Sequence, residues 1–441
     1  MEKISAPQYA KLVKAGKHLD AAAKSMRVLT SIEWAASHKT RFLKTGRLPQ
    51  PVYAKVDVSA ARNHIADAKR LLDGDDVVSA WLKRIGETLG VTASMIQARG
   101  TSAFFDHSAA LYGQPTRVML DRQTRVLDLA KHMDEALLDL DFDRLVVEGV
   151  EQSLSDSQFA RALRSRLSNH FHADDVPSVE ISATVSAKAA ASSTRIRVRQ
   201  GAEFTSRDVD QLLQHEALIH TATALNGKIQ KDFPILARSH PGTTEIQEGL
   251  AVFAEIITGA MDPRRFKRLS GRVLAIQMAV DGADFKEVYD FFVDRIDGPS
   301  QAYDNARRVM RGGLIEGGAP FTKDMVYLNG LLRVHNFMRT VVRMNRADLI
   351  RMLFVGKMDI EDVPALSQLA YQKRLAGPKY MPPWVSDLRF LVSYMAYSGF
   401  LNRMKMPGFQ AYYEQELTDV PSVWSLMRHD RIDQSGEDII E

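Results

Sequence analysis

Two spacings of apolar residues divide the chain. Between residues 60 and 175, apolar side chains recur every three to four positions, which predicts amphipathic helices. One of these segments is DVVSAWLKRIGETLG, in which Gly90 is expected to end the helix. Within 179–185 and again within 195–199, apolar and polar residues alternate strictly. This alternation predicts two strands of a small antiparallel sheet, separated by the small-residue stretch AAASS.

A long helix is predicted directly after the second strand, over residues 207–226. Thr205 or Ser206 is suited to be its N-cap, and the pair Asn226-Gly227 is suited to a left-handed stop. A second helix follows a connection that contains two prolines. Its expected start is Thr244, because Gln247 three residues later completes a capping-box pattern.

The second helix is expected to end at Gly259, and helical patterns then continue from residue 263 to about residue 428. The predicted fold is therefore α+β and mainly helical, with the small antiparallel sheet packed on the two helices just described. We expect four regions: an N-terminal helical extension (1–50), a helical N-terminal lobe (51–175), a core with the strands and the two helices (176–300), and a C-terminal helical lobe (301–441).

Composition narrows the classes of function. The 441 residues include no cysteine, which excludes disulfides, a cysteine nucleophile and cysteine-ligated metals. The 58 basic and 54 acidic residues are spread along the chain without a basic stripe, so we expect no nucleic-acid partner. The longest apolar run, residues 390–401, is too short to span a bilayer, and the N-terminus lacks the apolar core of a signal peptide. We therefore expect no membrane association and a cytoplasmic location.

The strongest chemical signal is the HExxxH motif formed by His215, Glu216 and His220. In an ideal α-helix, residues five positions apart differ by about 140° in direction, so these two imidazoles would face different sides. They converge on one ion only if the helix widens locally by one residue, as in a π-bulge. The alternative is an ordinary helix with two partly exposed histidines.

A third metal ligand is available in the second helix. Catalytic zinc is typically held by three protein ligands and a water, and Glu248 can supply the third. Gly249 and Ala251 are expected to leave room beside its carboxylate. Glu245 and Glu255 are rival carboxylates, and Glu255 is also suited to support a ligand from behind. A solvated carboxylate without a metal is the alternative for Glu248.

The two motifs make the sequence recognisable. HEALIHTATALNG (215–227) and TTEIQEGLAVFAEI (243–256) resemble the QEGLA-motif family, whose bacterial members are named flavohaemoglobin expression-modulating proteins. They are also similar to the catalytic domain of the microtubule-associated tyrosine carboxypeptidases of animals. FFDHSAALYG (104–113) and the stretch from RGG to FTKDMVYLNG (311–330) add weaker similarity.

The resemblance implies a gluzincin-like zinc metallopeptidase. It implies that His215 and His220 bind Zn²⁺, that Glu216 activates a water, and that Glu248 completes the site. The spacing also resembles that of dipeptidyl peptidase III, another HExxxH zinc enzyme, at the site alone. Gln247 agrees with the bacterial branch, whereas animal members carry an acid there.

Such a reaction needs a donor for the developing oxyanion, and the candidates are Tyr327, His335 and Tyr303. We select Tyr327 as the catalytic partner of Glu216. A carboxypeptidase must also bind the C-terminal carboxylate of its substrate, for which Arg311 and Lys323 are the candidates.

The arginines of the second strand, Arg195, Arg197 and Arg199, share one face and are suited to lie along the substrate. If that strand is an edge, a peptide can pair with it as an extra strand. Ordinary surface charge is the alternative for all these basic residues.

The sequence thus predicts a zinc metallocarboxypeptidase acting on the C-terminus of a peptide or protein. The alternatives are a zinc endopeptidase or aminopeptidase, and a regulatory protein that retains the site without useful catalysis.

Overall fold

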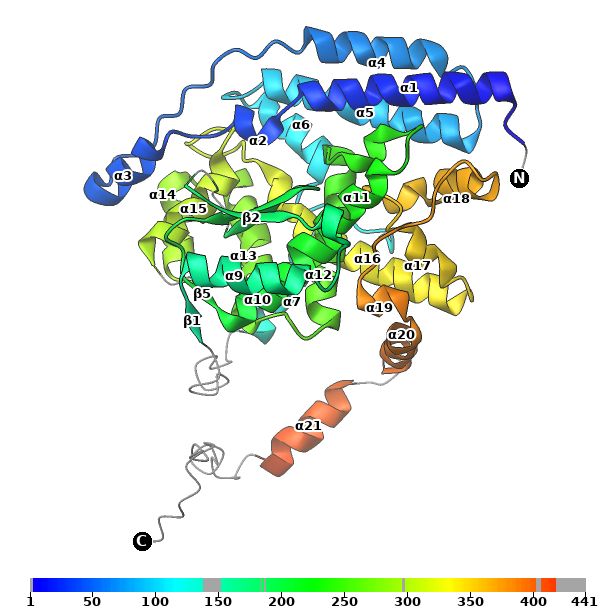
Figure 1. The fold of residues 1–441 in the computed structure, drawn as a ribbon. Coiled ribbons are helices and arrows are strands. Elements are labelled where there is room, and N and C mark those ends of the chain that lie inside the picture. The colour runs from blue at the N-terminus through cyan, green and yellow to red at the C-terminus, as the bar shows by residue number, and fades with distance from the viewer. Residues whose placement is uncertain are drawn as a thin grey trace.

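Helices account for most of the described chain (Figure 1). The computed structural model describes residues 3–137, 152–183, 185, 188–295, 298–401 and 406–417. The last part of the expected C-terminal lobe, 418–441, lies outside the described residues. The mainly helical α+β class predicted from the sequence is confirmed.

The elements are as follows. The strands are β1 (Ser153–Leu154), β2 (Ser178–Ser182), β3 (Ala189–Ala191), β4 (Arg195–Arg199) and β5 (Phe204–Thr205). The helices up to β2 are α1 (Ala6–Ser25), α2 (Val28–Ser31), α3 (Ala36–Thr45), α4 (Ser59–Leu71), α5 (Val77–Gln97), α6 (Ala103–Tyr112), α7 (Val126–Ala136) and α9 (Asp156–Leu167). The later helices are α10 (Ser206–Leu212), the π-helix η2 (Leu213–Thr221), α11 (Ala222–Lys228), α12 (Pro241–Ile257), α13 (Pro263–Val280), α14 (Phe285–Val293), α15 (Pro299–Met310), α16 (Met325–Arg343), α17 (Asp348–Met352), α18 (Val363–Tyr371), α19 (Pro383–Ser386), α20 (Arg389–Leu401) and α21 (Met406–Leu417). Short 3₁₀ helices are η1 (Ala173–Asp175), η3 (Pro234–Ala237), η4 (Thr322–Asp324) and η5 (Ile360–Asp362).

The N-terminal helices form a layer over the helices of the motifs. Figure 1 shows α1 and α4 side by side, with α5 beneath them and α11 and α12 below. Leu12, Leu19 and Trp81 of this layer are buried in the same large hydrophobic core as Phe233. The helix predicted to end at Gly90 instead continues to Gln97. It continues because its apolar stripe goes on beyond the glycine, and helix propensity is a weaker influence than that burial.

The sheet differs from the prediction. Both predicted strands form, as β2 and β4, but they pair in parallel rather than antiparallel. The small-residue stretch between them makes a third strand, β3, which pairs antiparallel with β4. The order is β2-β4-β3, so β4 lies at the centre and β3 at an edge. The prediction failed because it did not include β3. The chain turns back once between β2 and β3 and again between β3 and β4, so β4 runs in the same direction as β2.

The first motif helix is a continuous helical segment from Ser206 to Lys228 with the π-helix at its middle. Thr205 is its N-cap and forms a capping box with Asp208. The expected stop at Asn226-Gly227 is wrong, because the helix continues through both residues. Gly227 is instead a point of close approach: a Cβ there would lie 2.1 Å from the carbonyl oxygen of Leu236.

The second motif helix, α12, starts earlier than predicted. His240 is its N-cap and Pro241 occupies its first turn, so the predicted start at Thr244 is wrong. Its end agrees with the prediction, since Gly259 follows the C-cap with a positive φ of 72°.

Helix α12 crosses α16 at a contact between two glycines. A Cβ on Gly249 would lie 2.2 Å from the carbonyl carbon of Gly330, and one on Gly330 would lie 2.1 Å from the carbonyl oxygen of Glu245. Gly249 therefore serves the approach of the two helices, rather than leaving room beside Glu248 as the sequence suggested. The close crossing brings the first turn of α16 against the second motif helix.

Among the described residues, no helix has both the length and the apolar character needed to cross a membrane.

Candidate active site

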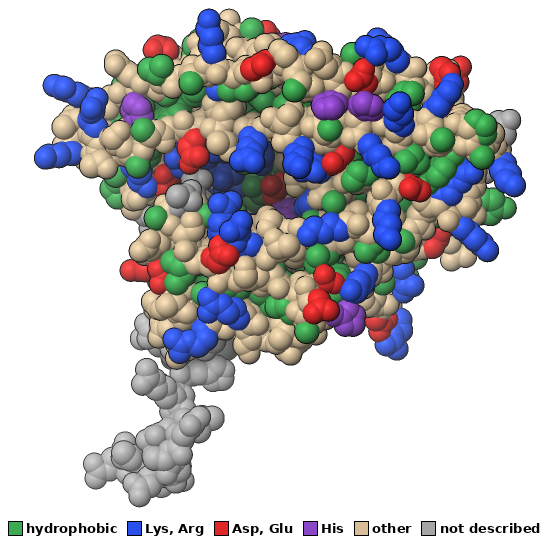
Figure 2. Space-filling view, turned by 45° about the horizontal axis from the view of Figure 1, so that its top comes forward, with side chains coloured by type: hydrophobic (Ala, Val, Ile, Leu, Met, Phe, Trp, Pro, Cys, Tyr) green, Lys and Arg blue, Asp and Glu red, His purple; other side chains and the backbone are tan. Residues whose placement is uncertain are grey.

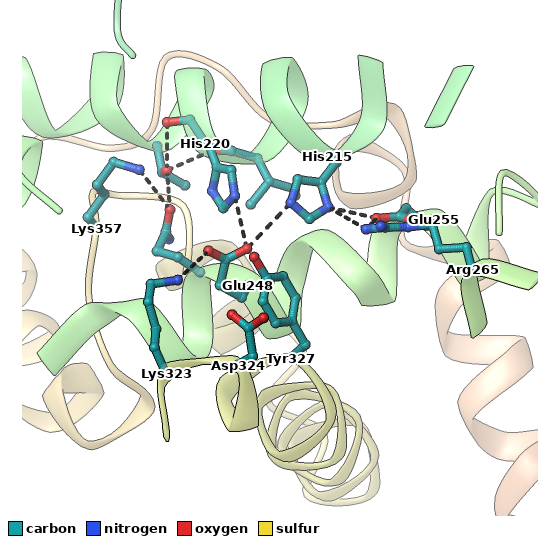
Figure 3. Close-up of polar contacts among 12 residues, drawn as sticks. His215, His220, Glu248, Glu255, Arg265, Lys323, Asp324, Tyr327 and Lys357 are labelled. Carbon is teal, nitrogen blue, oxygen red and sulfur yellow. Dashed lines mark hydrogen bonds and ion pairs between the residues drawn. The ribbon is translucent and has the colours of Figure 1, made fainter. Parts of the chain in front are cut away.

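The two motif histidines lie on the π-helix, as the spacing required. In a π-helix the backbone hydrogen bonds join residues five apart, so His215 and His220 come one above the other. Their ring centroids are 4.9 Å apart with the planes nearly perpendicular. Figure 3 shows both rings directed at the Glu248 carboxylate from the neighbouring helix. The predicted local widening of this helix is confirmed.

The three side chains offer one atom each to a common point. Glu248 Oε2 lies 3.4 Å from His215 Nε2 and 3.5 Å from His220 Nε2. Two ligands of a tetrahedral zinc ion, each bonded at about 2.0–2.1 Å, are about 3.3 Å apart. The donor set of two imidazoles and a carboxylate is one that zinc uses in catalytic sites. The arrangement therefore fits a divalent zinc ion.

His215 is held in place from its far side. Its Nδ1 lies 2.6 Å from Glu255 Oε1, and Glu255 is fully buried. Arg265 binds both oxygens of the same carboxylate, with Nη2 2.6 Å from Oε1. A carboxylate behind a metal-ligating imidazole fixes the orientation of the ring and leaves its Nε2 free for the ion. This is the supporting role that the sequence allowed for Glu255.

Glu245, the other rival, contacts side chains of α16 instead of the histidines. It accepts a hydrogen bond from Asn329 and lies 3.3 Å from Arg333. It therefore joins α12 to α16 and takes no part in the histidine cluster.

The electrostatics of the cluster favour positive charge. Burial alone would raise the pKa of Glu248, but Lys323 and the two histidines outweigh it and hold that pKa well below its usual range. Burial alone would lower the pKa of His215, but its hydrogen bonds to Glu248 and Glu255 raise it to about 10. Two buried carboxylates around one imidazole thus stabilise a cation there, and a metal would compete with the proton for this place.

Glu216 is positioned to exchange protons with a bound molecule. Its side chain lies on the π-helix, lines the pocket, and is only 8% exposed. Within the described ranges, no group hydrogen-bonds its carboxylate. It is therefore available to a water or substrate.

The cluster lies in a pocket of about 630 Å³, a size suited to a few amino-acid residues. Figure 2 shows Lys and Arg side chains gathered around the hollow on this face. The lining includes three candidates from the sequence, Tyr327, Arg311 and Lys323. Tyr303 and His335 are absent from the described lining: Tyr303 packs among the aromatic rings of Phe42 and Phe285, and His335 lies beside Phe253.

The candidate cations differ in what they already bind. Lys323 Nζ lies 3.5 Å from Glu248 Oε1, so its charge is engaged at the histidine cluster. Arg311 is 8% exposed and lies near the Phe321 ring, and its guanidinium has no hydrogen bond or ion pair within the described residues. Burial, together with the nearby Arg308, lowers the pKa of Arg311 to about 10, so it stays charged at neutral pH. A buried, unpaired guanidinium on a pocket wall is suited to bind an anion.

The two glycines after Arg311 lie close to neighbouring segments of the chain. A Cβ on Gly312 would lie 2.4 Å from the Phe104 ring, and one on Gly313 would lie 1.8 Å from the carbonyl oxygen of Ala319. They allow close packing inside the protein and do not open the backbone to a ligand.

The three arginines of β4 have different surroundings, so they do not line the pocket together. Arg197 lines the pocket, whereas Arg195 pairs with Glu180 and Arg199 lies 3.5 Å from Asp304. The idea that β4 is an edge is wrong, because it has a strand on each side. The edge strand that borders the pocket is β3.

Sequence reasoning missed several residues that shape the pocket. Lys357 is buried and donates to Gln247 Oε1 at 3.1 Å, and Gln247 also accepts from Thr223 at 2.8 Å (Figure 3). Burial lowers the pKa of Lys357 to about 8. Arg265 and Lys357 lie outside all the stretches that carry the family resemblance, so no sequence signal pointed to them.

His240, the N-cap of α12, makes the protein sensitive to acid. Burial, with a contribution from Arg238, lowers the pKa of His240 to about 4. The unfolded chain takes up this proton below about pH 6.5 and the folded chain only near pH 4, so stability is lost as the pH falls between these values. We expect the free energy of unfolding to fall by about 2 kcal/mol between pH 6.5 and pH 4.5, out of about 3 kcal/mol over the whole window. Urea unfolding at pH 6.5 and 4.5 measures it.

The variant His240→Asn is the control, because asparagine also caps a helix but does not titrate. It should show a weaker pH dependence of the unfolding free energy than the wild type. An identical dependence in both proteins would show that His240 is not responsible.

Comparison with known proteins adds one match. A family model described as microtubule-associated tyrosine carboxypeptidase matches residues 40–403. A search of curated proteins gave no match. The matched range contains the π-helix, α12, β3 and the basic side chains from Arg197 to Lys357, and leaves α1 outside.

Proposed function

Because the chain belongs to the microtubule-associated tyrosine carboxypeptidase family, we propose that it is a zinc metallocarboxypeptidase of gluzincin-like fold. Family membership implies a carboxypeptidase-type activity on a peptide or protein. The proposal adds the metal and the residues. The observation that carries it is the convergence of His215, His220 and Glu248 on one point, in a pocket also lined by the Glu216 carboxylate, which no described group hydrogen-bonds.

Zinc bound by these three residues would lower the pKa of a water towards neutrality and polarise a peptide carbonyl. Glu216 would accept a proton from the attacking water. The same carboxyl group then delivers the proton to the leaving amine. Glu255 and Arg265 hold the His215 ring in position throughout.

Tyr327 is the proposed donor to the developing oxyanion. Its hydroxyl lies 3.4 Å from Arg308 Nη2, and the Arg272 guanidinium lies 4.8 Å from the centre of its ring. Figure 3 shows the hydroxyl beside the Glu248 carboxylate. The hydroxyl oxygen accepts from Arg308, so its own O–H can be donated to another acceptor. Tyr327 is therefore proposed as the catalytic partner of Glu216.

The substrate is proposed to enter with its C-terminal carboxylate at Arg311. A charged carboxylate that leaves water needs a charged donor, and Arg311 is a buried guanidinium of the pocket without a partner among the described residues. Lys323 contributes charge, although it is shared with Glu248. The edge strand β3 borders the same pocket, so its free backbone groups are suited to pair with an extended peptide.

A matched pair of peptides tests the direction of cleavage. We expect release of single residues from the C-terminus of a free-acid peptide, and much slower cleavage when the same peptide is amidated. Arg311→Ala should raise the Michaelis constant or lower turnover about tenfold or more for the acid and change the amide little. Mass spectrometry of both peptides with both enzymes gives the result.

Equal cleavage of the acid and the amide by the wild type would contradict carboxypeptidase action and support an endopeptidase. Cleavage of neither would support the regulatory alternative. Arg161→Ala, at an exposed position of α9 outside the described pocket lining, is the control and should behave as the wild type.

A further inference from the structure

A second cluster of metal-binding side chains lies on the N-terminal layer, outside the active site. His18 belongs to α1, whereas His64 and Asp67 belong to α4, which runs beside it (Figure 1). His64 and Asp67 are three residues apart and so share one face of their helix. One ligand atom from each of the three residues lies within 4.8 Å of the others.

The distances suit a shared ion. His18 Nδ1 lies 3.2 Å from His64 Nδ1 and 3.8 Å from Asp67 Oδ2. Ligands of a tetrahedral zinc ion are about 3.3 Å apart, so the two nitrogens already have this separation. Asp67 uses its other oxygen for Arg70, at 2.9 Å, which leaves Oδ2 directed at the histidines.

A hydrogen bond between the two imidazoles explains the short distance between His18 and His64, but it does not explain the nearby Asp67 carboxylate. One neutral ring can donate to the other through Nδ1, but that contact leaves the nearby carboxylate oxygen unused. A cation between the rings would be bound by both nitrogens and by Asp67 Oδ2 together. Two imidazoles and a carboxylate with an open fourth position form a donor set for Zn²⁺, Ni²⁺ or Cu²⁺.

We propose that His18, His64 and Asp67 form a second site, for a structural divalent transition-metal ion that joins α1 to α4. The ligands are half-buried rather than buried, with His18 24% and Asp67 38% exposed. The ion therefore exchanges with solvent more readily than one held in the pocket. The site binds added metal and does not retain it against a chelator.

The site matters because α1 forms part of the pocket. Ala23 and the following residues Met26 and Arg27 line it. The helix is held to the segment before α12 through Tyr9, which donates to Asp232 at 2.6 Å, and through Asp20, which pairs with Arg238. A metal that joins α1 to α4 stabilises this wall, which lies outside the range matched by the family.

Calorimetric titration of untagged, full-length protein with ZnCl₂ and NiCl₂ tests the proposal. The titration is made in a His215→Ala/His220→Ala background, so that the pocket contributes no binding. We expect about one equivalent of added metal to bind, and the melting temperature to rise with metal. His64→Gln and His18→Gln should each weaken binding at least tenfold and abolish the rise.

His132→Gln, at an exposed histidine of α7, is the matched control and should bind as the parent does. Melting in the absence of metal shows whether each variant is folded, and Asp67→Asn provides a variant with little change in shape. Absence of saturable binding in the parent would overturn the proposal. Equal binding by the parent and by His64→Gln would also overturn it. Neither result would affect the assignment of the pocket.

Discussion

Replacing Glu216 by glutamine is expected to lower turnover by about two to four orders of magnitude while the zinc stays bound. Glutamine has nearly the same shape but cannot accept a proton. Glu216 lines the pocket beside the histidine cluster and has no hydrogen-bond partner in the described part of the chain, so the change removes its chemistry and little packing. Single-residue release from a free-acid peptide measures turnover, and elemental analysis of the same sample measures zinc.

The same change at an exposed carboxylate, Glu203→Gln, is the control and should leave both quantities unaltered. Unchanged turnover in Glu216→Gln would show that another group is the base. Loss of zinc with this variant would mean that Glu216 is itself a ligand.

Gly249→Ala is expected to destabilise the protein strongly, because it places a methyl group at the crossing of α12 and α16. The new Cβ would lie 2.2 Å from the carbonyl carbon of Gly330, far inside contact distance and against backbone that cannot rotate away. Helices α12 and α16 must therefore separate. We expect a loss of about 3 kcal/mol or more in the free energy of unfolding, at or above the upper end for overpacked cores. Turnover should also fall, because Glu248 on α12 and Tyr327 on α16 move apart.

Gly271→Ala is the matched control. Gly271 lies inside α13, and a Cβ there meets no atom within 4 Å. Alanine is favoured over glycine within a helix by about 0.5–1 kcal/mol, so this variant should be as stable as the wild type or more stable. Denaturant unfolding of the three proteins gives the comparison. Similar stability of Gly249→Ala and the wild type would contradict the crossing described for α12 and α16.

The π-helix shows what sequence could establish about this site. A spacing of five between two histidines is incompatible with one face of an α-helix, so the requirement for a wider turn followed from geometry alone. Glu248 was chosen as the third candidate ligand because it belongs to the motif of the next helix. Each of these inferences used a single short segment of the chain.

Long-range contacts were beyond the sequence. Arg265 reaches Glu255 only through the turn between α12 and α13, and Lys357 reaches Gln247 from 110 residues away. The unpaired state of Arg311 depends on which neighbours the folded chain provides, and no local pattern records it.

Local sequence rules for helix ends and strand pairing also failed at positions where tertiary packing determines the structure. Gly90 and Gly227 resemble helix stops, but α5 and α11 continue through them because both glycines lie within buried or closely packed segments. The strand pattern of residues 179–199 was read correctly, whereas the direction of pairing depended on β3, whose alanines show no alternation.

The zinc content of variants tests the central claim most directly. Untagged proteins are passed through a weak chelator, which removes exchangeable surface metal, and are then analysed for zinc and protein. The proposed site predicts about one zinc per chain in the wild type and in Glu216→Gln, and almost none in His215→Ala or His220→Ala. Stoichiometric zinc in the His215→Ala/His220→Ala double variant, or none in the wild type, would contradict a catalytic zinc held by His215, His220 and Glu248.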